Sequence, residues 1–157
     1  MIAEAVAAPV IRQATAEDVP AIVTMAEHFL AATVYHSRTA TTSESLEKSA
    51  RLIVENGVVL LAISDEGRSQ GMLAGLTYDH YLTNVRMASE SVWWVEPDAR
   101  GGQIARDLLR AFEAWAATRG ATEIEIGSWH PRLDRFYERL GYEAAERVYR
   151  KVVSDGA

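Results

Sequence analysis

Cysteine is absent from this sequence. Its absence excludes a disulfide framework, a zinc site built from thiolates and a cysteine nucleophile, and it is compatible with a reducing compartment. Four histidines are present, but they do not stand at the spacing of metal ligands. We therefore expect no metal site and no covalent relay through a thiol.

Long apolar runs and a positively charged N-terminal region are also missing. The longest apolar run is far shorter than the roughly 20 residues that cross a bilayer. Residues 1–9, MIAEAVAAP, carry no Lys or Arg, whereas a signal peptide begins with a positive region. We expect a cytoplasmic protein without a membrane segment, in which residues 1–9 form a loose leader.

Basic residues are also few relative to acidic ones. The chain has 16 Lys and Arg against 22 Asp and Glu, which gives a formal net charge of −6. Nucleic-acid binding is therefore not expected, whereas cationic substrates such as amines are slightly favoured. With 48% apolar and 24% charged residues, the composition is that of a globular protein. The length fits a single domain over residues 10–157.

The spacing of the apolar residues predicts the secondary structure. The predicted strands are residues 10–13, 58–63, 71–78, 86–95, 122–126 and 143–153, and the predicted helices are about 19–32, 44–56, 104–119 and 132–140. The order β-α-α-β-β-β-α-β-α-β predicts an α/β (mixed α+β) fold with a central mixed sheet and helices on both faces. A doubly wound nucleotide-binding fold would alternate strand and helix from the start and carry its glycines after the first strand, so it is disfavoured.

Residues 91–106, SVWWVEPDARGGQIAR, are the most informative segment. An apolar strand stops at Pro97, Gly101 and Gly102 allow a tight turn, and an amphipathic helix follows. The first amides of a helix lack intrahelical acceptors, and the macrodipole adds positive charge there. This connection therefore predicts a site for an anion such as a pyrophosphate.

The same segment resembles the coenzyme A motif of the GNAT acyltransferases (Gcn5-related N-acetyltransferases), written Arg/Gln-x-x-Gly-x-Gly/Ala after a Val-x-Pro strand end. Arg100, Ile104 and Ala105 fit this motif, and Gln103 stands where the family usually has a glycine. The order of elements also resembles that of the family from residue 10 to residue 151. The resemblance implies acetyl-CoA as the acyl-donating cosubstrate, bound by Trp93, Trp94, Val95, Arg100, Gly101, Gly102, Gln103, Ile104, Ala105 and Arg106.

A second segment, residues 136–142 with the sequence FYERLGY, resembles the family's Phe-Tyr-Glu-Lys-Leu-Gly-Phe segment. The resemblance implies that Tyr137 lies near the coenzyme sulfur and donates a proton to the departing thiolate, since a phenol with a pKa of about 10 is protonated at neutral pH. His130 stands seven residues earlier, where the family often has asparagine, and could bond the pantetheine arm. The competing interpretations are that Tyr137 only packs between helix and sheet and that His130 is a surface residue.

Two acidic residues are candidates for the general base. Glu90 lies on the strand that leads to the motif, with the same parity as Val92 and Trp94, where the resemblance often places a base. Glu125 lies on the next strand, at the position that the ribosomal-protein N-terminal acetyltransferases of the family use. Either carboxylate could assist deprotonation of an alkyl ammonium, and either could instead be a solvated residue on a half-exposed strand. The sequence does not rank them firmly.

Together these features predict an acetyl-CoA-dependent N-acetyltransferase in which a primary amine attacks the thioester directly in a ternary complex. Aromatic residues near loops are candidates for the amine pocket: Tyr35, His36, Tyr78, His80 and Tyr81. The alternative is a non-catalytic acyl-CoA-binding sensor or partner-binding domain of the same fold, which the departures at Gln103 and His130 keep open. The sequence does not determine the acceptor amine, the acyl chain preference or whether the protein is a homodimer.

Overall fold

The computed structural model describes residues 7–35 and 41–153. Most of the expected leader and His36 lie outside the described residues. By their internal contacts the chain divides into two compact units, residues 1–127 and residues 128–157. Each unit is described by itself, and the single domain expected over residues 10–157 stays a prediction.

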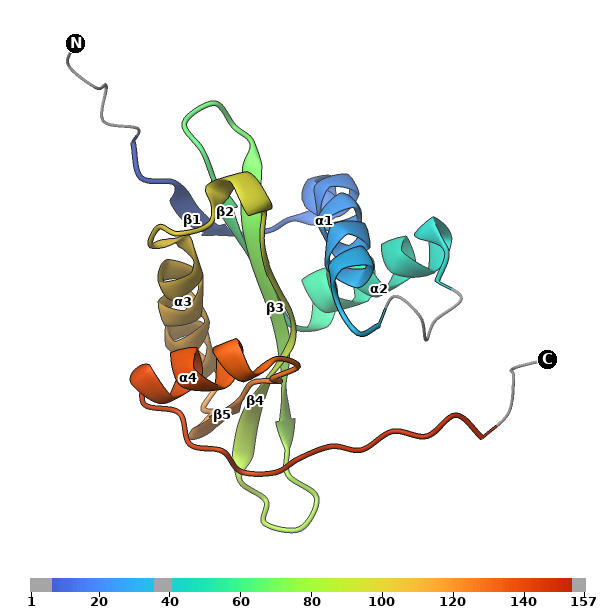
Figure 1. Ribbon diagram of the computed structural model, residues 1–157, viewed down its shortest axis with the longest axis vertical. Helices are drawn as coiled ribbons and strands as arrows, with labels where there is room; N and C mark the ends of the chain where they lie inside the picture. Colours follow the sequence, from blue (N-terminus) through green and yellow to red (C-terminus); the bar gives the residue numbers. More distant parts are fainter. Residues whose placement is uncertain (1–6, 36–40, 154–157) are drawn as a thin grey trace. The chain divides into compact units, whose positions relative to one another are not determined.

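The first unit contains a five-stranded sheet with the strand order β1-β2-β3-β4-β5 (Figure 1). The first three neighbouring pairs are antiparallel, and β4 pairs with β5 in parallel. All eight strands and helices predicted for this unit have their expected bounds or differ by a residue or two, and the sheet is mixed as predicted. The elements in chain order are β1 Val10–Gln13, η1 Ala16–Asp18, α1 Val19–Ala32, α2 Ser43–Asn56, β2 Val58–Ile63, β3 Ser69–Asp79, β4 Arg86–Val95, η2 Pro97–Ala99, α3 Ile104–Thr118 and β5 Glu123–Glu125.

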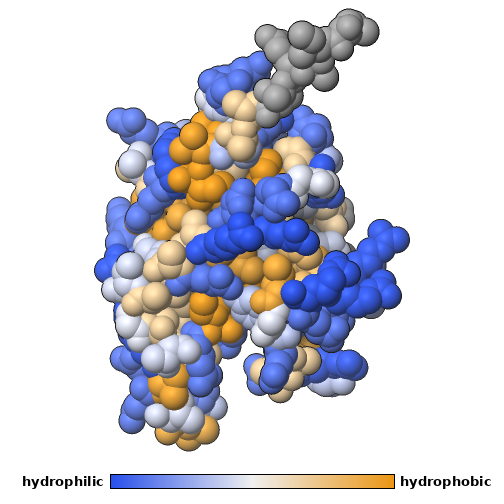
Figure 2. All heavy atoms as spheres, turned by 90° about the vertical axis from the view of Figure 1, so that its left-hand side faces the viewer, coloured by the Kyte–Doolittle hydropathy of each residue, from blue (hydrophilic) through white to orange (hydrophobic). Residues whose placement is uncertain are grey.

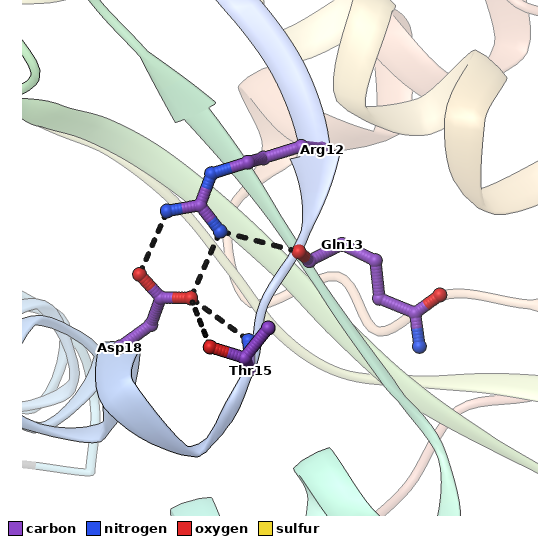
Figure 3. Close-up of polar contacts among 4 residues, drawn as sticks. All are labelled: Arg12, Gln13, Thr15 and Asp18. Atoms are coloured by element: carbon purple, nitrogen blue, oxygen red, sulfur yellow. Dashed lines mark hydrogen bonds and ion pairs between the residues drawn. The ribbon is translucent and has the colours of Figure 1, made fainter.

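Helix α1 begins where the sequence places a hydroxyl and an acid three residues apart. The Asp18 carboxylate accepts a hydrogen bond of 2.8 Å from the Thr15 amide, as in a capping box. Both Asp18 oxygens also accept from the Arg12 guanidinium at 2.8 Å, as Figure 3 shows. The bonds from Arg12 are the main reason that the pKa of Asp18 falls from 3.8 to about 2. The end of β1 and the start of α1 are thus joined by a bidentate ion pair.

Helices cover both faces of this sheet. Helices α1 and α2 pack on one face, where their apolar side chains form one cluster with alternate residues of β2, β3 and β4. Helix α3 packs on the other face and buries Leu108 and Phe112 completely. Gly71 and Gly75 of β3 allow this helix to lie close, because a Cβ on Gly75 would stand 2.6 Å from Phe112 Cε2 and one on Gly71 would stand 3.3 Å from Ile104 Cγ2.

The second unit contains α4, Pro131–Arg139. His130 is its N-cap residue, since the His130 Nδ1 accepts from the Arg132 amide at 3.1 Å. Gly141 follows the helix with a φ of +90°, a left-handed conformation that glycine adopts without strain. The expected helix over 132–140 is therefore confirmed to within one residue.

The expected strand over residues 143–153 is wrong. These residues carry no strand in the structure, and the apolar side chains that suggested one are exposed: Val148, Tyr149, Val152 and Val153. A strand is stabilised only by hydrogen bonds to a neighbouring strand, and an alternating pattern does not specify such a neighbour. Figure 2 shows one face of the surface, on which apolar residues form patches that hydrophilic residues separate.

Candidate active site

Strand β4 contains a β-bulge next to Glu90. Val92 pairs with Ala74 and Glu90 pairs with Gly75, so Ser91 is an additional residue on the β4 side. Val92 and Ala74 belong to the packed layer under α1 and α2, whereas Gly75 faces Phe112 of α3. The expectation that Glu90 shares a face with Val92 and Trp94 is therefore wrong, because the bulge shifts the alternation by one residue.

The Glu90 carboxyl group is half-buried and bonded to the backbone of a distant segment. Its Oε2 accepts a hydrogen bond of 3.1 Å from the Gly127 amide. Burial disfavours the charged form and raises the pKa of Glu90 from 4.5 to about 7, and the bond from Gly127 opposes this shift. A carboxyl group that titrates near neutral pH can take up and release a proton under physiological conditions.

Glu125 lies on the opposite face of the sheet from Glu90. It pairs with Ser89 in the parallel ladder, and neighbouring residues of a strand point to opposite faces. Its Oε1 accepts a hydrogen bond of 2.8 Å from the Tyr78 hydroxyl, and the residue is exposed. The structure therefore does not bring the two predicted base candidates together.

The ladder between β4 and β5 is short. It joins residues 87–89 to residues 123–125, while β4 continues to Val95. In the described part of the chain, no strand extends this ladder alongside residues 90–95 of β4. The bond between Glu90 and Gly127 lies where the ladder ends. One edge of the second half of β4 is thus not covered by β5.

The residues that follow β4 are held by contacts from three other elements. The Glu96 amide donates to the Gln70 carbonyl at 2.9 Å, and the Glu96 carboxylate lies 2.9 Å from His28 Nδ1 of α1. Asp98 of η2 forms an ion pair of 2.9 Å with Arg68, which precedes β3. The strand end therefore leads into a fixed segment.

Residues 101–106, which come after this fixed segment, have backbone amides without a hydrogen-bond acceptor in the part of the chain that the structure describes. Among the described residues, no carbonyl or side chain accepts a hydrogen bond from the amides of residues 101–106, and the first helical bond of α3 runs from Asp107 to Gln103 at 2.9 Å. Gly101 has a φ of +88°, which explains why a glycine stands there. The Gln103 side chain makes no hydrogen bond to these amides within the described part of the chain. A run of outward amides at a helix start favours an anion.

The two tryptophans of the predicted site, Trp93 and Trp94, lie on opposite faces of the sheet. Trp94 is 7% exposed and packs edge-on against Phe29 of α1, with 6.3 Å between the ring centroids. Trp93 pairs with Leu73 and so lies on the α3 face. Arg100 lies over the Trp94 ring and donates to the Val95 carbonyl at 2.9 Å. Trp94 is therefore a core residue.

The second unit holds the remaining predicted site residues. Tyr137 lies on α4, with its ring centroid 5.9 Å from that of Phe136 and 6.5 Å from that of Tyr142. His130 caps the same helix through Nδ1, so this nitrogen is occupied by a backbone bond. Ser128 is hydrogen-bonded to Asp134 in the first turn of the helix.

The candidates for the amine pocket lie on separate elements. Tyr78 is on β3 and bonds Glu125, while His80 and Tyr81 stack on each other in the connection between β3 and β4, with 5.0 Å between their ring centroids. Tyr35 follows α1 and packs near Phe29 at 6.0 Å. Within residues 7–35 and 41–153, no helix is long and apolar enough to cross a membrane, and no group of three or more potential metal ligands occurs.

Sequence reasoning missed the partners of the predicted site residues. Gly127 bonds Glu90, Gly75 lies opposite it, and His28 contacts the strand end from α1. Each of these residues is far from its partner along the chain. Nothing in the local pattern singles them out, and an alignment of related sequences would have been the signal to find them.

Comparisons with known proteins agree with this architecture. The sequence model of the Acetyltransferase (GNAT) family matches residues 23–142. A sequence search finds no match among curated proteins. Among solved structures, the aminoglycoside N-acetyltransferase AAC(6')-Iy in complex with a bisubstrate analogue has a TM-score of 0.76 at 18% identity, covering 93% of this chain and 99% of that one.

Two further structures are similar. Glucosamine-6-phosphate N-acetyltransferase from Arabidopsis thaliana has a TM-score of 0.73 at 14% identity, covering 92% of this chain and 98% of that one. An acetyltransferase from Trypanosoma brucei has a TM-score of 0.72 at 18% identity, covering 92% and 99%. At these identities the structures show a shared fold, and the match to the family's sequence model over most of the chain shows the family. The chain belongs to the GNAT family of acetyltransferases.

Proposed function

We propose that this protein is an acetyl-CoA-dependent N-acetyltransferase that transfers the acetyl group to a primary amine by direct attack in a ternary complex. One observation carries the proposal: the amides of residues 101–106 have no acceptor in the described part of the chain, and only residues 96–100 separate them from the strand that bears Glu90. Family membership supplies the reaction class, and two structures of one relative, AAC(6')-Iy, in complex with CoA and with a CoA conjugate support the donor.

The residues of the turn fit a diphosphate. Six successive amides without an acceptor, a left-handed Gly101 and the N-terminal end of α3 together offer hydrogen-bond donors and partial positive charge. Trp93, Trp94 and Val95 lead the chain to this turn, and beyond Ser89 the β5 side of β4 has no ladder partner among the described residues. An extended, amide-rich pantetheine chain could lie along that edge as an added strand.

Glu90 is the proposed general base. Its pKa of about 7 leaves a large share of the group as carboxylate at neutral pH, which can accept a proton from the amine as nitrogen attacks the thioester carbon. The C–N bond forms, the C–S bond breaks, and the electron pair of that bond leaves with sulfur. Glu125 is the alternative base, and its bond to Tyr78 orients its carboxylate on the other face.

Tyr137 is the proposed proton donor to the departing thiolate, and His130 is a proposed contact of the donor's arm. An ordinary phenol is protonated at neutral pH and can donate. His130 Nδ1 already caps α4, so only its other ring nitrogen would be available for the arm. We further propose a cytoplasmic location, which the lack of cysteine and the need for acetyl-CoA support. A homodimer stays a prediction.

The proposal is tested in two steps. Acetyl-CoA should raise the melting temperature of the protein, because a ligand that binds only the folded state stabilises it by mass action. A screen of CoA release across amine classes should then find an acceptor, and it should include aminoglycosides and glucosamine 6-phosphate, which two relatives acetylate by name.

Replacing Tyr137 with phenylalanine separates an enzyme from a sensor. In an enzyme the Tyr137→Phe variant should release CoA about 10- to 1,000-fold more slowly, since it loses general-acid catalysis but keeps the ring. A sensor would bind acetyl-CoA and show no turnover with any amine in the parent protein. Failure of acetyl-CoA to stabilise the parent would refute both interpretations.

A further inference from the structure

The Arg100 side chain is engaged by the protein itself. Its Nε–H donates to the Val95 carbonyl at 2.9 Å, and its Cζ lies 4.5 Å from the centroid of the Trp94 ring. A guanidinium above a tryptophan face is attracted by the negative face of the ring. Arg100 thus folds back onto the last two residues of β4, and we call these two contacts the Arg100 clasp.

Trp94 is a rigid anchor for the clasp. The residue is buried in the cluster between the sheet and α1, and Phe29 meets its ring edge-on with an interplanar angle of 87°. Side chains in such a core are closely packed and hold one position. The guanidinium is therefore fixed against a surface that does not move with the turn.

The clasp stands at the boundary between a fixed segment and a run of amides without acceptors. Glu96 and Asp98 before it are held by His28 and Arg68. Gly101 directly after it has a φ of +88°, and the amides of residues 101–106 have no acceptor among the described residues. Arg100 is the last residue before the turn whose side chain is tied to the rest of the first unit.

We propose that the Arg100 side chain is a positioning residue for the acyl carrier: through Trp94 and Val95 it fixes the start of the Gly101 turn, so that the amides of residues 101–106 are aligned before the diphosphate binds. This inference rests on the proposed function. On this proposal the guanidinium acts through its contacts with Val95 and Trp94 and not as a ligand of the phosphates. Alignment before binding lowers the ordering cost that would otherwise reduce affinity.

Calorimetric titration with coenzyme A at several salt concentrations tests the clasp. The Arg100→Ala variant should bind coenzyme A about 3- to 30-fold more weakly, the range expected for a lost cation–π contact. Its affinity should keep the salt dependence of the parent, since no ion pair with the ligand is lost. In kinetics the same change should raise KM for acetyl-CoA and leave kcat within about twofold.

Two other arginines provide control variants for the effect of Arg100→Ala on coenzyme A binding. Arg106 is exposed in the first turn of α3, beside the same amides, and the Arg106→Ala variant should show a flatter salt dependence because it removes a cation near the phosphates. Arg119 lies over the Trp115 ring, with its Cζ 5.8 Å from the centroid, at the other end of α3. The Arg119→Ala variant removes a similar contact away from the turn and should bind coenzyme A like the parent.

A double-mutant cycle tests whether Arg100 acts through the ring. In a Trp94→Leu background, Arg100→Ala should weaken binding by less than half of its effect in the parent, on a logarithmic scale. If Trp94→Leu folds poorly, Trp94→Phe keeps an aromatic core residue and offers a weaker ring to the cation. Full additivity in the background that folds would overturn the proposal.

The outcomes separate the two proposals. If the parent binds coenzyme A and Arg100→Ala flattens the salt dependence as Arg106→Ala does, Arg100 is a phosphate ligand and the positioning role is refuted alone. If the parent does not bind coenzyme A at any salt concentration, the proposed function fails and the positioning role fails with it.

Discussion

Glu90 and Glu125 lie on neighbouring parallel strands, yet the sheet gives them different surroundings. Glu90 lies on the α3 face, half-buried and bonded to the Gly127 amide, and its pKa is raised to about 7. Glu125 lies on the opposite face, exposed and bonded to the Tyr78 hydroxyl. Burial is the largest cause of the Glu90 shift, so the packing around the sheet gives one of two identical side chains a titration near neutral pH.

The largest expected effect is on catalysis. Glu90→Gln keeps the shape of the side chain and removes the proposed base, so kcat/KM should fall roughly 100- to 10,000-fold. Glu125→Gln is the matched control, because its amide oxygen can still accept from Tyr78, and its kcat/KM should stay within about tenfold of the parent. Steady-state rates with acetyl-CoA and the best amine of the screen measure both variants.

The opposite order of kinetic losses would exchange the roles proposed for Glu90 and Glu125. A large loss in Glu125→Gln with a small one in Glu90→Gln would assign the base to the exposed carboxylate. If Glu90 is the base, kcat/KM should rise as pH increases through about 7 in the parent and in Glu125→Gln alike.

The second effect is on stability as a function of pH. The folded-state pKa of Glu90 lies above its unfolded value of 4.5, so between pH 4.5 and about 7 the folded protein holds more protons than the unfolded chain. The free energy of unfolding should therefore fall as pH rises through this window, by at most about 3 kcal/mol. In Glu90→Gln this contribution should be absent. Urea unfolding at a series of pH values, with Glu125→Gln as control, measures the difference.

Asp18 does not interfere with that measurement. Its folded pKa is about 2, below the unfolded value of 3.8, so its contribution to stability is present above pH 3.8 and is lost as pH falls toward 2. A parent and a Glu90→Gln variant whose unfolding free energies differ by the same amount at every pH would contradict the assigned shift of Glu90.

The smallest expected effect is on stability, and it concerns the hydrogen bond between Tyr78 and Glu125 on the face opposite Glu90. Tyr78→Phe removes the hydroxyl that bonds Glu125, and because the pair is exposed it should lower the free energy of unfolding by about 0.5–1.5 kcal/mol. The pH window of stability assigned to Glu90 should persist in this variant, since the two groups lie on different faces. Loss of that window in Tyr78→Phe would show that the faces are coupled.

Local pattern predicted most of the fold. The start of α1 follows from Thr15 and Asp18. Strands β1, β2 and β4 have their expected bounds because apolar alternation and the flanking turn residues act over a few residues. The turn after Pro97 was also predicted, since Gly101 does adopt a left-handed φ. These features depend on neighbours in the chain.

The features that the sequence did not predict depend on contacts with distant segments. The bulge at Ser91 is a property of the ladder between β3 and β4, so the face on which Glu90 lies could not be predicted from β4 alone. The expected strand over residues 143–153 failed for the same reason, because its alternation specified no hydrogen-bonded neighbour. Arg100 matched a motif, but its position over Trp94 appears only in three dimensions.

The sequence by itself determined the family, the order of the elements and the glycine turn that leads into α3, since periodicity, capping and turn chemistry are encoded within short segments. The tertiary structure decided which carboxylate is buried, which side chain lies over the Trp94 ring and where the ladder between β4 and β5 ends. Burial and hydrogen bonding between distant segments set those properties, and both exist only once the sheet and its helices have packed.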